Sequence, residues 1–238
     1  MKGAVVFNGI NALDFHAVRC NVVRIPEVVK RLRDAQRIWD DVECLEGLEL
    51  ANFIASDDEV FLGNIRLKSL ASAIVQVGLY DRYIKAFGVP ECLIGSINGD
   101  SALAVAVGLY SFEDMIRNSA AVLNRSWSEG RVAGELVLSG ISLVKFAAFE
   151  RVEIEGRQTY QEIKVDGREL GPLITQMIED LGVKRFVNVG PGNLLMHRQG
   201  TELEMAEVQI LESIDMDPML NWFWPELKES PLARASTH

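Results

Sequence analysis

Apolar and polar residues follow two different patterns along this chain. Short apolar runs bounded by turn residues cover residues 2–7, 92–94 and 183–189, and runs of this length predict buried strands. Residues 28–39 and 67–87 repeat their apolar positions every three or four residues, which predicts amphipathic helices. Strands and helices therefore alternate, as is typical of α/β proteins.

Residues 91–114 combine a strand, a glycine-containing turn and two helices. The strand leads into a turn that carries Ser96, an apolar helix follows, and Ser111-x-x-Asp114 has the spacing of a capping box at the start of a second helix. A serine at a strand-to-helix turn has the geometry of a nucleophile elbow, because the turn exposes the hydroxyl beside backbone N–H groups that can hold an oxyanion. Ser96 is therefore the candidate nucleophile.

Between residues 125 and 170 the pattern changes to short alternating or apolar runs, which predict strands and hairpins. These runs are Val132–Leu138, Leu143–Phe149, Val152–Ile154 and Tyr160–Val165. Residues 226–238 have the composition of a disordered tail. The sequence contains no internal repeat and no linker, so we expect residues 1–225 to form a single domain.

Composition narrows the classes of function. With 48% hydrophobic residues, the 238-residue chain can bury a sizeable core, and its formal net charge of −10 argues against a nucleic-acid partner. There is no apolar run of 18 residues, so we expect no membrane span. Cys20, Cys44 and Cys92 are scattered and odd in number, which favours free thiols over disulfides or a metal site. A cytoplasmic globular protein is the expectation.

Three patches of the chain, in the same order, resemble malonyl-CoA:acyl carrier protein transacylases and polyketide synthase acyltransferases. Residues 91–114 are similar to the family's nucleophile region, where G-H-S-L-G-E-Y-S-A-L leads through a short apolar helix to a second helix start. Ala4–Gly9 is similar to the N-terminal F-x-F-P-G-Q-G-S-Q, and Gly182–Leu195 is close to the late G-V-x-x-F-V-E-V-G-P-G-K-V-L. The resemblance implies an α/β domain with a mainly parallel central sheet and helices on both faces, like the large subdomain of these enzymes.

The resemblance also implies that the family's small ferredoxin-like subdomain is absent or reduced. Ser96 and Gly190 are only 94 residues apart, a much shorter interval than in the family. The strands predicted within residues 125–170 are therefore expected to form a reduced β insertion in its place.

Carried onto this sequence, the resemblance places the family's nucleophile on Ser96. It places the oxyanion hole on the backbone N–H groups of Ile10 and Ile97, although the loop that holds Ile10 also has the pattern of an ordinary strand-ending turn. Gly95 and Asn98 flank the serine and are expected to contact the substrate.

Two family residues have no direct counterpart here. The arginine that pairs with the malonyl carboxylate falls near residues 122–123, and Arg125, one helical turn away, is the candidate for its role. The catalytic histidine is missing, because no histidine occurs between His16 and His197. His16 follows the first loop and is the candidate base for Ser96; the alternative is a histidine that only packs or faces solvent.

Two classes of function remain open. In the first, Ser96 accepts an acyl group from a CoA or acyl carrier protein thioester and passes it to another thiol or to water, as a non-standard transfer or hydrolysis in fatty acid or polyketide biosynthesis that needs no metal or cofactor. In the second, the protein is a non-catalytic pseudo-acyltransferase that binds a carrier protein, a synthase component or a second copy of itself. A third possibility is a serine esterase on a different α/β plan, which would use Ser96 as its nucleophile and His197 as its base.

A basic cluster on the helix predicted over residues 28–39 has two interpretations. Its members are Lys30, Arg31, Arg33 and Arg37. They form either a solvated helix face or a docking surface for an acidic partner such as an acyl carrier protein.

Overall fold

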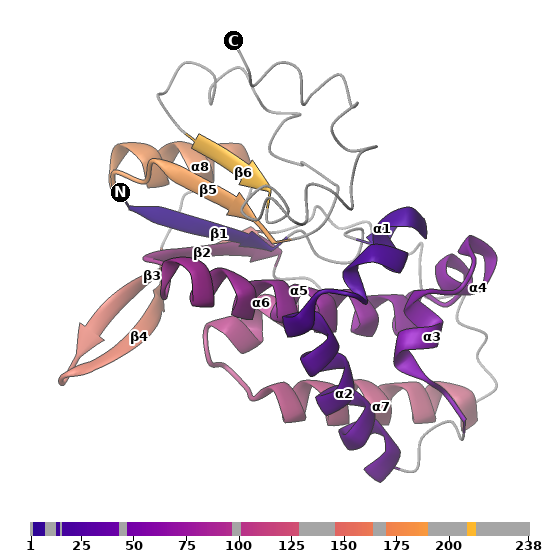
Figure 1. Ribbon diagram of the computed structural model, residues 1–238. Coiled ribbons are helices and arrows are strands. Elements are labelled where there is room, and N and C mark those ends of the chain that lie inside the picture. The colour runs from indigo at the N-terminus through magenta and orange to yellow at the C-terminus, as the bar shows by residue number, and fades with distance from the viewer. Residues whose placement is uncertain are drawn as a thin grey trace.

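The computed structural model describes residues 2–7, 13–14, 16–42, 47–96, 101–128, 146–163, 170–189 and 209–212. The described residues form one six-stranded sheet in the order β4-β3-β2-β1-β5-β6 (Figure 1). The strands are β1 (Gly3–Phe7), β2 (Cys92–Ser96), β3 (Phe146–Ile154), β4 (Arg157–Glu162), β5 (Arg185–Asn188) and β6 (Gln209–Glu212). Strands β2, β1, β5 and β6 run parallel, and β3 and β4 add two antiparallel pairs at one side. The predicted mainly parallel sheet is confirmed.

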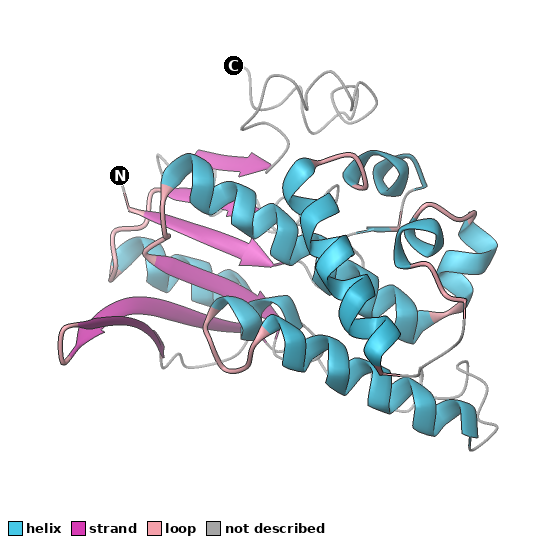
Figure 2. Ribbon diagram, turned by 60° about the horizontal axis from the view of Figure 1, so that its bottom comes forward, coloured by secondary structure: helices cyan, strands magenta, loops and turns pink. Residues whose placement is uncertain are grey.

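Helices cover both faces of the sheet, as expected (Figures 1 and 2). They are α1 (His16–Val22), α2 (Pro26–Asp41), α3 (Leu50–Ile54), α4 (Asp58–Gly63), α5 (Ile65–Phe87), α6 (Ser101–Ala106), α7 (Phe112–Ser128) and α8 (Leu170–Glu179). In β1, Val5 and Phe7 join the larger hydrophobic cluster with α2, α5, α6 and α7, whereas Ala4 and Val6 join a smaller cluster with α8. Burial on both faces is what a central parallel strand requires.

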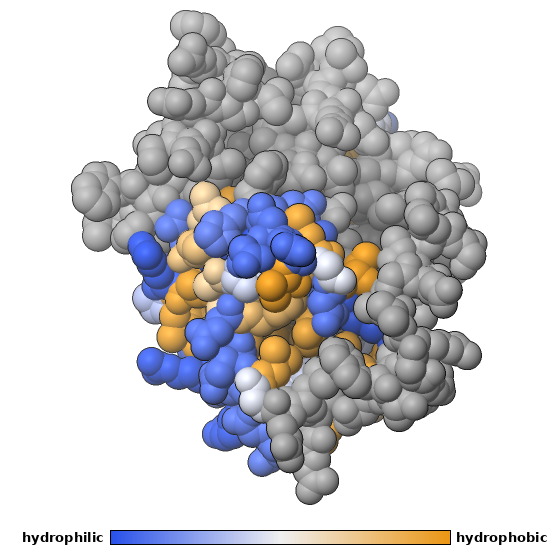
Figure 3. Space-filling model, turned by 90° about the vertical axis from the view of Figure 1, so that its right-hand side faces the viewer, coloured by the Kyte–Doolittle hydropathy of each residue, from blue (hydrophilic) through white to orange (hydrophobic). Residues whose placement is uncertain are grey.

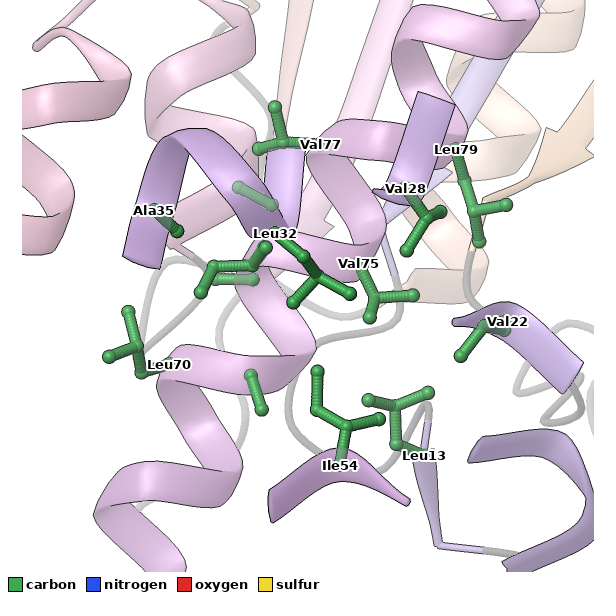
Figure 4. Close-up of a cluster of buried hydrophobic side chains, with 14 of the residues drawn as sticks. Leu13, Val22, Val28, Leu32, Ala35, Ile54, Leu70, Val75, Val77 and Leu79 are labelled. Carbon is green, nitrogen blue, oxygen red and sulfur yellow. The ribbon is translucent and has the colours of Figure 1, made fainter. Parts of the chain in front are cut away.

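The larger hydrophobic cluster is built on the packing of α2 against α5. Val28 and Leu32 of α2 lie against Val75 and Leu79 of α5 in the interior of this cluster (Figure 4). The two helices approach closely at Gly78, where an added Cβ would lie 2.7 Å from the Cα of Val28. The helices predicted over residues 28–39 and 67–87 are thus confirmed.

The capping box predicted at the start of α7 is present. The Ser111 Oγ accepts a hydrogen bond from the Asp114 backbone N–H at 3.0 Å, and Asp114 Oδ2 accepts from the Ser111 backbone N–H at 3.2 Å. The hydrogen bond from the Ser111 hydroxyl to this carboxylate lowers the pKa of Asp114. Reciprocal bonds of this kind satisfy N–H groups that a helix start leaves unpaired.

The described part of the region between α7 and α8 is a hairpin that continues the central sheet. Strand β3 pairs with β2 from Cys92↔Glu150 to Ser96↔Phe146, and a turn at Glu155–Gly156 with positive φ angles leads into β4. The two runs predicted at Leu143–Phe149 and Val152–Ile154 belong in large part to the single strand β3. Glu150 and Arg151 are polar and interrupt the apolar pattern in the sequence. The strand continues through them, and Glu150 forms an ion pair with Lys2, with 2.8 Å between Oε1 and Nζ.

The tyrosine of the second strand anchors this hairpin to the rest of the sheet. The Tyr160 hydroxyl donates a hydrogen bond to the Pro90 carbonyl oxygen at 2.8 Å, just before β2. The run predicted at Val132–Leu138 and the tail predicted over 226–238 lie outside the described residues.

Candidate active site

The carboxyl ends of β1 and β2 lie side by side, and Ser96 is at this edge. Phe7 of β1 is paired with Gly95 of β2, and Ser96 is the last residue of β2. The next described residue is Ser101, which begins α6. The backbone thus has the predicted order of strand, connection and helix, with Ser96 at the end of the strand rather than within the turn. In open α/β sheets, ligands bind at this edge of the parallel strands.

The predicted oxyanion-hole residues fall in the two connections that leave these strands. Residues 8–12, which include Ile10, follow Phe7, and residues 97–100, which include Ile97 and Asn98, follow Ser96. Both connections and the side chain of Ser96 lie outside what the structure describes. Gly95 is buried in the sheet between β1 and β3. The assignments of Ile10, Ile97, Gly95 and Asn98 stay predictions.

His16 begins α1, which lies beyond the carboxyl edge of the sheet (Figure 1). Its Nε2 is 3.4 Å from the carbonyl oxygen of Ala55 and 3.4 Å from the Sγ of Cys20. These contacts place the imidazole against the end of α3 and against a thiol of its own helix. The role of His16 as a base for Ser96 stays a prediction.

Arg125 lies in α7, and its side chain is outside the described part of the chain. At the family's arginine position, Val122 is half-exposed and Leu123 is buried. An arginine from a different helix reaches this place: Arg66, in the first turn of α5, donates from Nη1 to the Val122 carbonyl oxygen at 3.2 Å. Arg66 could not be predicted from the sequence, because no pattern in a single sequence connects residues 56 positions apart.

Two buried cations near the carboxyl edge of the sheet were also not predicted from the sequence. Arg19 of α1 is fully buried, and Lys68 in the first part of α5 is nearly so. A signal for Arg19 existed in the sequence, since it lies one residue after Val18 and three before Val22 on the apolar face of its helix. Lys68 forms an ion pair with Asp14, with 2.6 Å between Nζ and Oδ1.

The basic cluster of α2 separates into one structural arginine and an exposed group. Arg31 forms two hydrogen bonds with the carboxylate of Asp81, which raise its pKa, and its guanidinium lies 4.7 Å from the centre of the Phe112 ring. The other three members are exposed, and Arg37 lies 3.8 Å from Asp34. Arg31 therefore joins α2 to α5 and α7.

The surface beyond the carboxyl edge of the sheet exposes both hydrophobic and hydrophilic residues. Hydrophobic and hydrophilic residues alternate there without one continuous apolar face among the described residues (Figure 3), and α4 exposes Val60 and Leu62. The described residues contain no group of three or more His, Cys, Asp or Glu side chains that could hold a metal ion. Within the same residues, no helix is long and apolar enough to cross a membrane.

The fold is shared with solved malonyl-CoA:acyl carrier protein transacylases, although protein-family models and curated proteins give no match to this sequence. The enzyme of Synechocystis sp. PCC 6803 superposes with a TM-score of 0.59 at 11% identity, over 93% of this chain and 100% of that chain. The Clostridium perfringens enzyme gives a TM-score of 0.59 at 12% identity, over 99% of this chain and 100% of that chain. The Streptococcus pneumoniae enzyme gives a TM-score of 0.58 at 14% identity, over 89% of this chain and 95% of that chain.

A further similar structure is a malonyl-transacylase in complex with its type II polyketide synthase acyl carrier protein. Its TM-score is 0.52 at 11% identity, over 89% of this chain and 95% of that chain. At these identities the comparison concerns architecture. This chain therefore has a transacylase fold, and the resemblance found in the sequence is confirmed for the fold.

Proposed function

We propose that this chain is a cytoplasmic acyl-transfer protein of fatty acid or polyketide biosynthesis that accepts an acyl group on Ser96. The observation that carries the proposal is the position of Ser96 on a transacylase fold: it ends β2 at the carboxyl edge of the parallel strands, directly before the connection to α6. A strand-to-helix connection at this edge is where a serine can meet both a substrate and backbone N–H donors.

The proposed reaction is the transfer of an acyl group between oxygen and sulfur. The Ser96 hydroxyl oxygen attacks the carbonyl carbon of a CoA or carrier-protein thioester. The O–C bond forms, the C–S bond breaks, and the serine proton passes through a base to the departing sulfur, which leaves as a thiol. A second thiol or water then attacks the carbonyl carbon of the acyl-serine ester; the bond from this carbon to the serine oxygen breaks, and the proton of the attacking group passes through the base to that oxygen and regenerates the hydroxyl. Backbone N–H groups of Ile10 and Ile97 would stabilise the oxyanion of each step.

The remaining assignments follow from the same proposal. His16 is the base, and its ring leaves the contacts with Ala55 and Cys20 when it serves Ser96. Gly95, Asn98 and Arg125 contact the acyl donor. An acyl carrier protein is the proposed partner, and the exposed arginines and lysine of α2 would attract its acidic surface.

The decisive experiment is intact-protein mass spectrometry after incubation with malonyl-CoA, acetyl-CoA and longer acyl-CoAs. We expect the mass of one acyl group to appear on the native protein and to be lost in Ser96→Ala. His16→Ala should slow formation of this adduct by about a hundredfold, the usual contribution of a general base. Ser101→Ala, which changes a serine at the start of α6, is the matched control and should be acylated normally.

A second candidate function is favoured by the contacts of His16. If its imidazole stays with Ala55 and Cys20, the proposed transfer loses its candidate base, and the chain would act as a non-catalytic binding partner of a carrier protein or synthase. No adduct from any acyl-CoA or from acyl carrier protein thioesters would sink the enzymatic proposal. Binding of the unmodified protein to an acyl carrier protein would then support this second function.

A further inference from the structure

Strand β4 forms an exposed edge of the sheet. It is the terminal strand in the sheet order, and among the described residues it pairs only with β3. The hairpin of β3 and β4 projects beyond the helices that cover the rest of the sheet (Figures 1 and 2). Every residue of β4 except the half-buried Tyr160 is exposed. The strand therefore presents a row of backbone donors and acceptors to which another strand can bond.

The hydrogen bonds of the hairpin show which backbone groups face outward. Ile163, directly after β4, donates its N–H to the Ala148 carbonyl oxygen at 2.8 Å. Bonded and non-bonded pairs alternate in an antiparallel ladder, so the odd-numbered residues of β4 bond to β3. The two-residue turn with positive φ at Glu155 and Gly156 requires the same pattern, because the residues that flank such a turn form a bonded pair. The even-numbered residues therefore direct their N–H and C=O groups away from β3; they are Gln158, Tyr160 and Glu162.

β4 lacks the features that keep the edge strands of many proteins from pairing. Such strands are short, bulged or interrupted by proline, or they carry charges along their length. β4 has six residues in unbroken register with β3, and its sequence Arg-Gln-Thr-Tyr-Gln-Glu has charges only at its two ends. Its four central residues are uncharged and include Thr159 and Tyr160, which are residue types that favour strands.

A second copy of β4 fits this edge with two-fold symmetry. A two-fold axis perpendicular to the sheet keeps each face on its own side, so the numbers of two opposed residues must be both odd or both even. The register centred on Tyr160 meets this condition and uses all three outward-facing residues of each strand. It opposes Tyr160 to Tyr160 of the second copy, Gln158 to Glu162, and Thr159 to Gln161.

The opposed side chains in this register are chemically compatible. No two like charges face each other, and the Gln158 amide is a donor for the Glu162 carboxylate, a pair that occurs twice because the interface is symmetric. Gln158 Nε2 also donates to Glu153 of its own hairpin at 3.0 Å, and its second N–H serves the second copy. A register centred on Thr159 would instead oppose Glu162 to Gly156, which belongs to the turn.

We propose that two copies of this chain associate through β4, by antiparallel pairing centred on Tyr160, and form one continuous sheet across the dimer. The inference does not depend on Ser96 or on the proposed acyl transfer. A single pair of six-residue strands buries less than the roughly 1,600 Å² of a typical stable interface. We therefore expect a reversible dimer with a dissociation constant of about 1–100 µM.

Sedimentation velocity over a concentration series that spans this range measures the dissociation constant. We expect Gln158→Lys to lower it by about twofold to thirtyfold, because the variant opposes lysine to Glu162 at two symmetric positions. The double variant Gln158→Lys with Glu162→Lys opposes lysine to lysine and should raise it by a similar factor. Glu162→Lys alone is the matched control and should change it by less than about twofold, because a glutamine amide can bond to either charge.

Cysteine cross-linking tests the register. Thr159→Cys and Gln161→Cys should form an intermolecular disulfide under mild oxidation only when the two variants are mixed. Opposed Cα atoms of a non-bonded pair lie about 4.5 Å apart, within the range that a disulfide spans. Either variant alone opposes its cysteine to a native residue and provides the control. Peptide mapping by mass spectrometry identifies the joined residues, and circular dichroism checks that every variant is folded.

Three results would overturn the inference. A monomer throughout the concentration series would show that β4 does not pair with a second copy. A dimer that responds neither to Gln158→Lys nor to the double variant would use a different surface. A disulfide in Thr159→Cys alone would place Thr159 on the two-fold axis and refute the register.

Discussion

The two cysteines Cys20 and Cys92 differ in their burial and in their neighbours. Cys92 lies in β2 and is fully buried, and burial raises the pKa of its thiol to about 12. Cys20 is partly exposed on α1, with Sγ 3.4 Å from the Nε2 of His16. Only a thiolate is a strong nucleophile, so the two thiols should differ in reactivity.

We expect iodoacetamide to alkylate Cys20 in the folded protein at neutral pH and to leave Cys92 unmodified until the protein unfolds. The rate difference should be on the order of a hundredfold or more, because Cys92 has almost no thiolate and no access to solvent. Peptide mapping by mass spectrometry distinguishes the two sites, and Cys20→Ser provides the control. Labelling of Cys92 at the rate of Cys20 would show that β2 opens readily and that its assigned burial is wrong.

At the scale of elements, long periodic segments could be predicted from the sequence and short ones could not. Helices α2 and α5 have enough turns for their apolar positions to repeat, and the Ser111–Asp114 capping box is a local signal. Helices α3 and α4 have five and six residues, too few for a period. They are held instead by the bonds of Arg19 to Ile54 and Asp58, which come from a distant part of the chain.

The same distinction applies to the candidate site. The order of strand, connection and helix around Ser96 was predictable, because the three are consecutive in the sequence, but Ser96 was expected in the turn and is the last residue of β2. The contacts of His16 with Ala55, of Lys68 with Asp14 and of Arg66 with Val122 were not, because each joins residues that only the folded chain brings together. Sequence patterns report periodicity, and side-chain partners depend on tertiary packing.

The packing of α2 on α5 depends on a glycine. We expect Gly78→Ala to lower the free energy of unfolding by about 1–3 kcal/mol, because the new Cβ would lie 2.7 Å from the Val28 Cα and would force the helices apart. The 2.7 Å contact is with backbone, so the overpacking cost lies at the upper end of its usual range and outweighs the gain of about 1 kcal/mol that alanine brings to a helix. Urea unfolding followed by circular dichroism measures the change.

Gly63 provides the matched control. It ends α4, and a Cβ there meets nothing within 4 Å, so Gly63→Ala should leave the free energy of unfolding unchanged or slightly higher. Equal stabilities of Gly78→Ala and the native protein would mean that the two helices do not cross at this distance.

At the scale of the whole molecule, the central strands belong to two hydrophobic layers at once. Alternate residues of β1 and β2 contribute to the large cluster with α5 and to the small cluster with α8; Leu93 and Ile94 are adjacent in sequence and lie on opposite faces. A disturbance of one layer therefore reaches the other through the strands they share. This arrangement predicts that both layers unfold together, in line with the single domain expected over residues 1–225.

Met177→Ala tests this coupling from the small layer. Met177 is a buried residue of α8, and its truncation should lower the free energy of unfolding by about 2–3 kcal/mol. If the layers unfold as one unit, the slowest-exchanging amides of α5, on the other face of the sheet, should lose the same free energy of protection in native-state hydrogen exchange. Leu109→Ala, at a side chain that is 71% exposed, should change neither quantity by more than about 0.5 kcal/mol. Loss of protection in α8 alone, with α5 unchanged, would instead mean that α8 opens independently and that the sheet does not transmit the loss between its two faces.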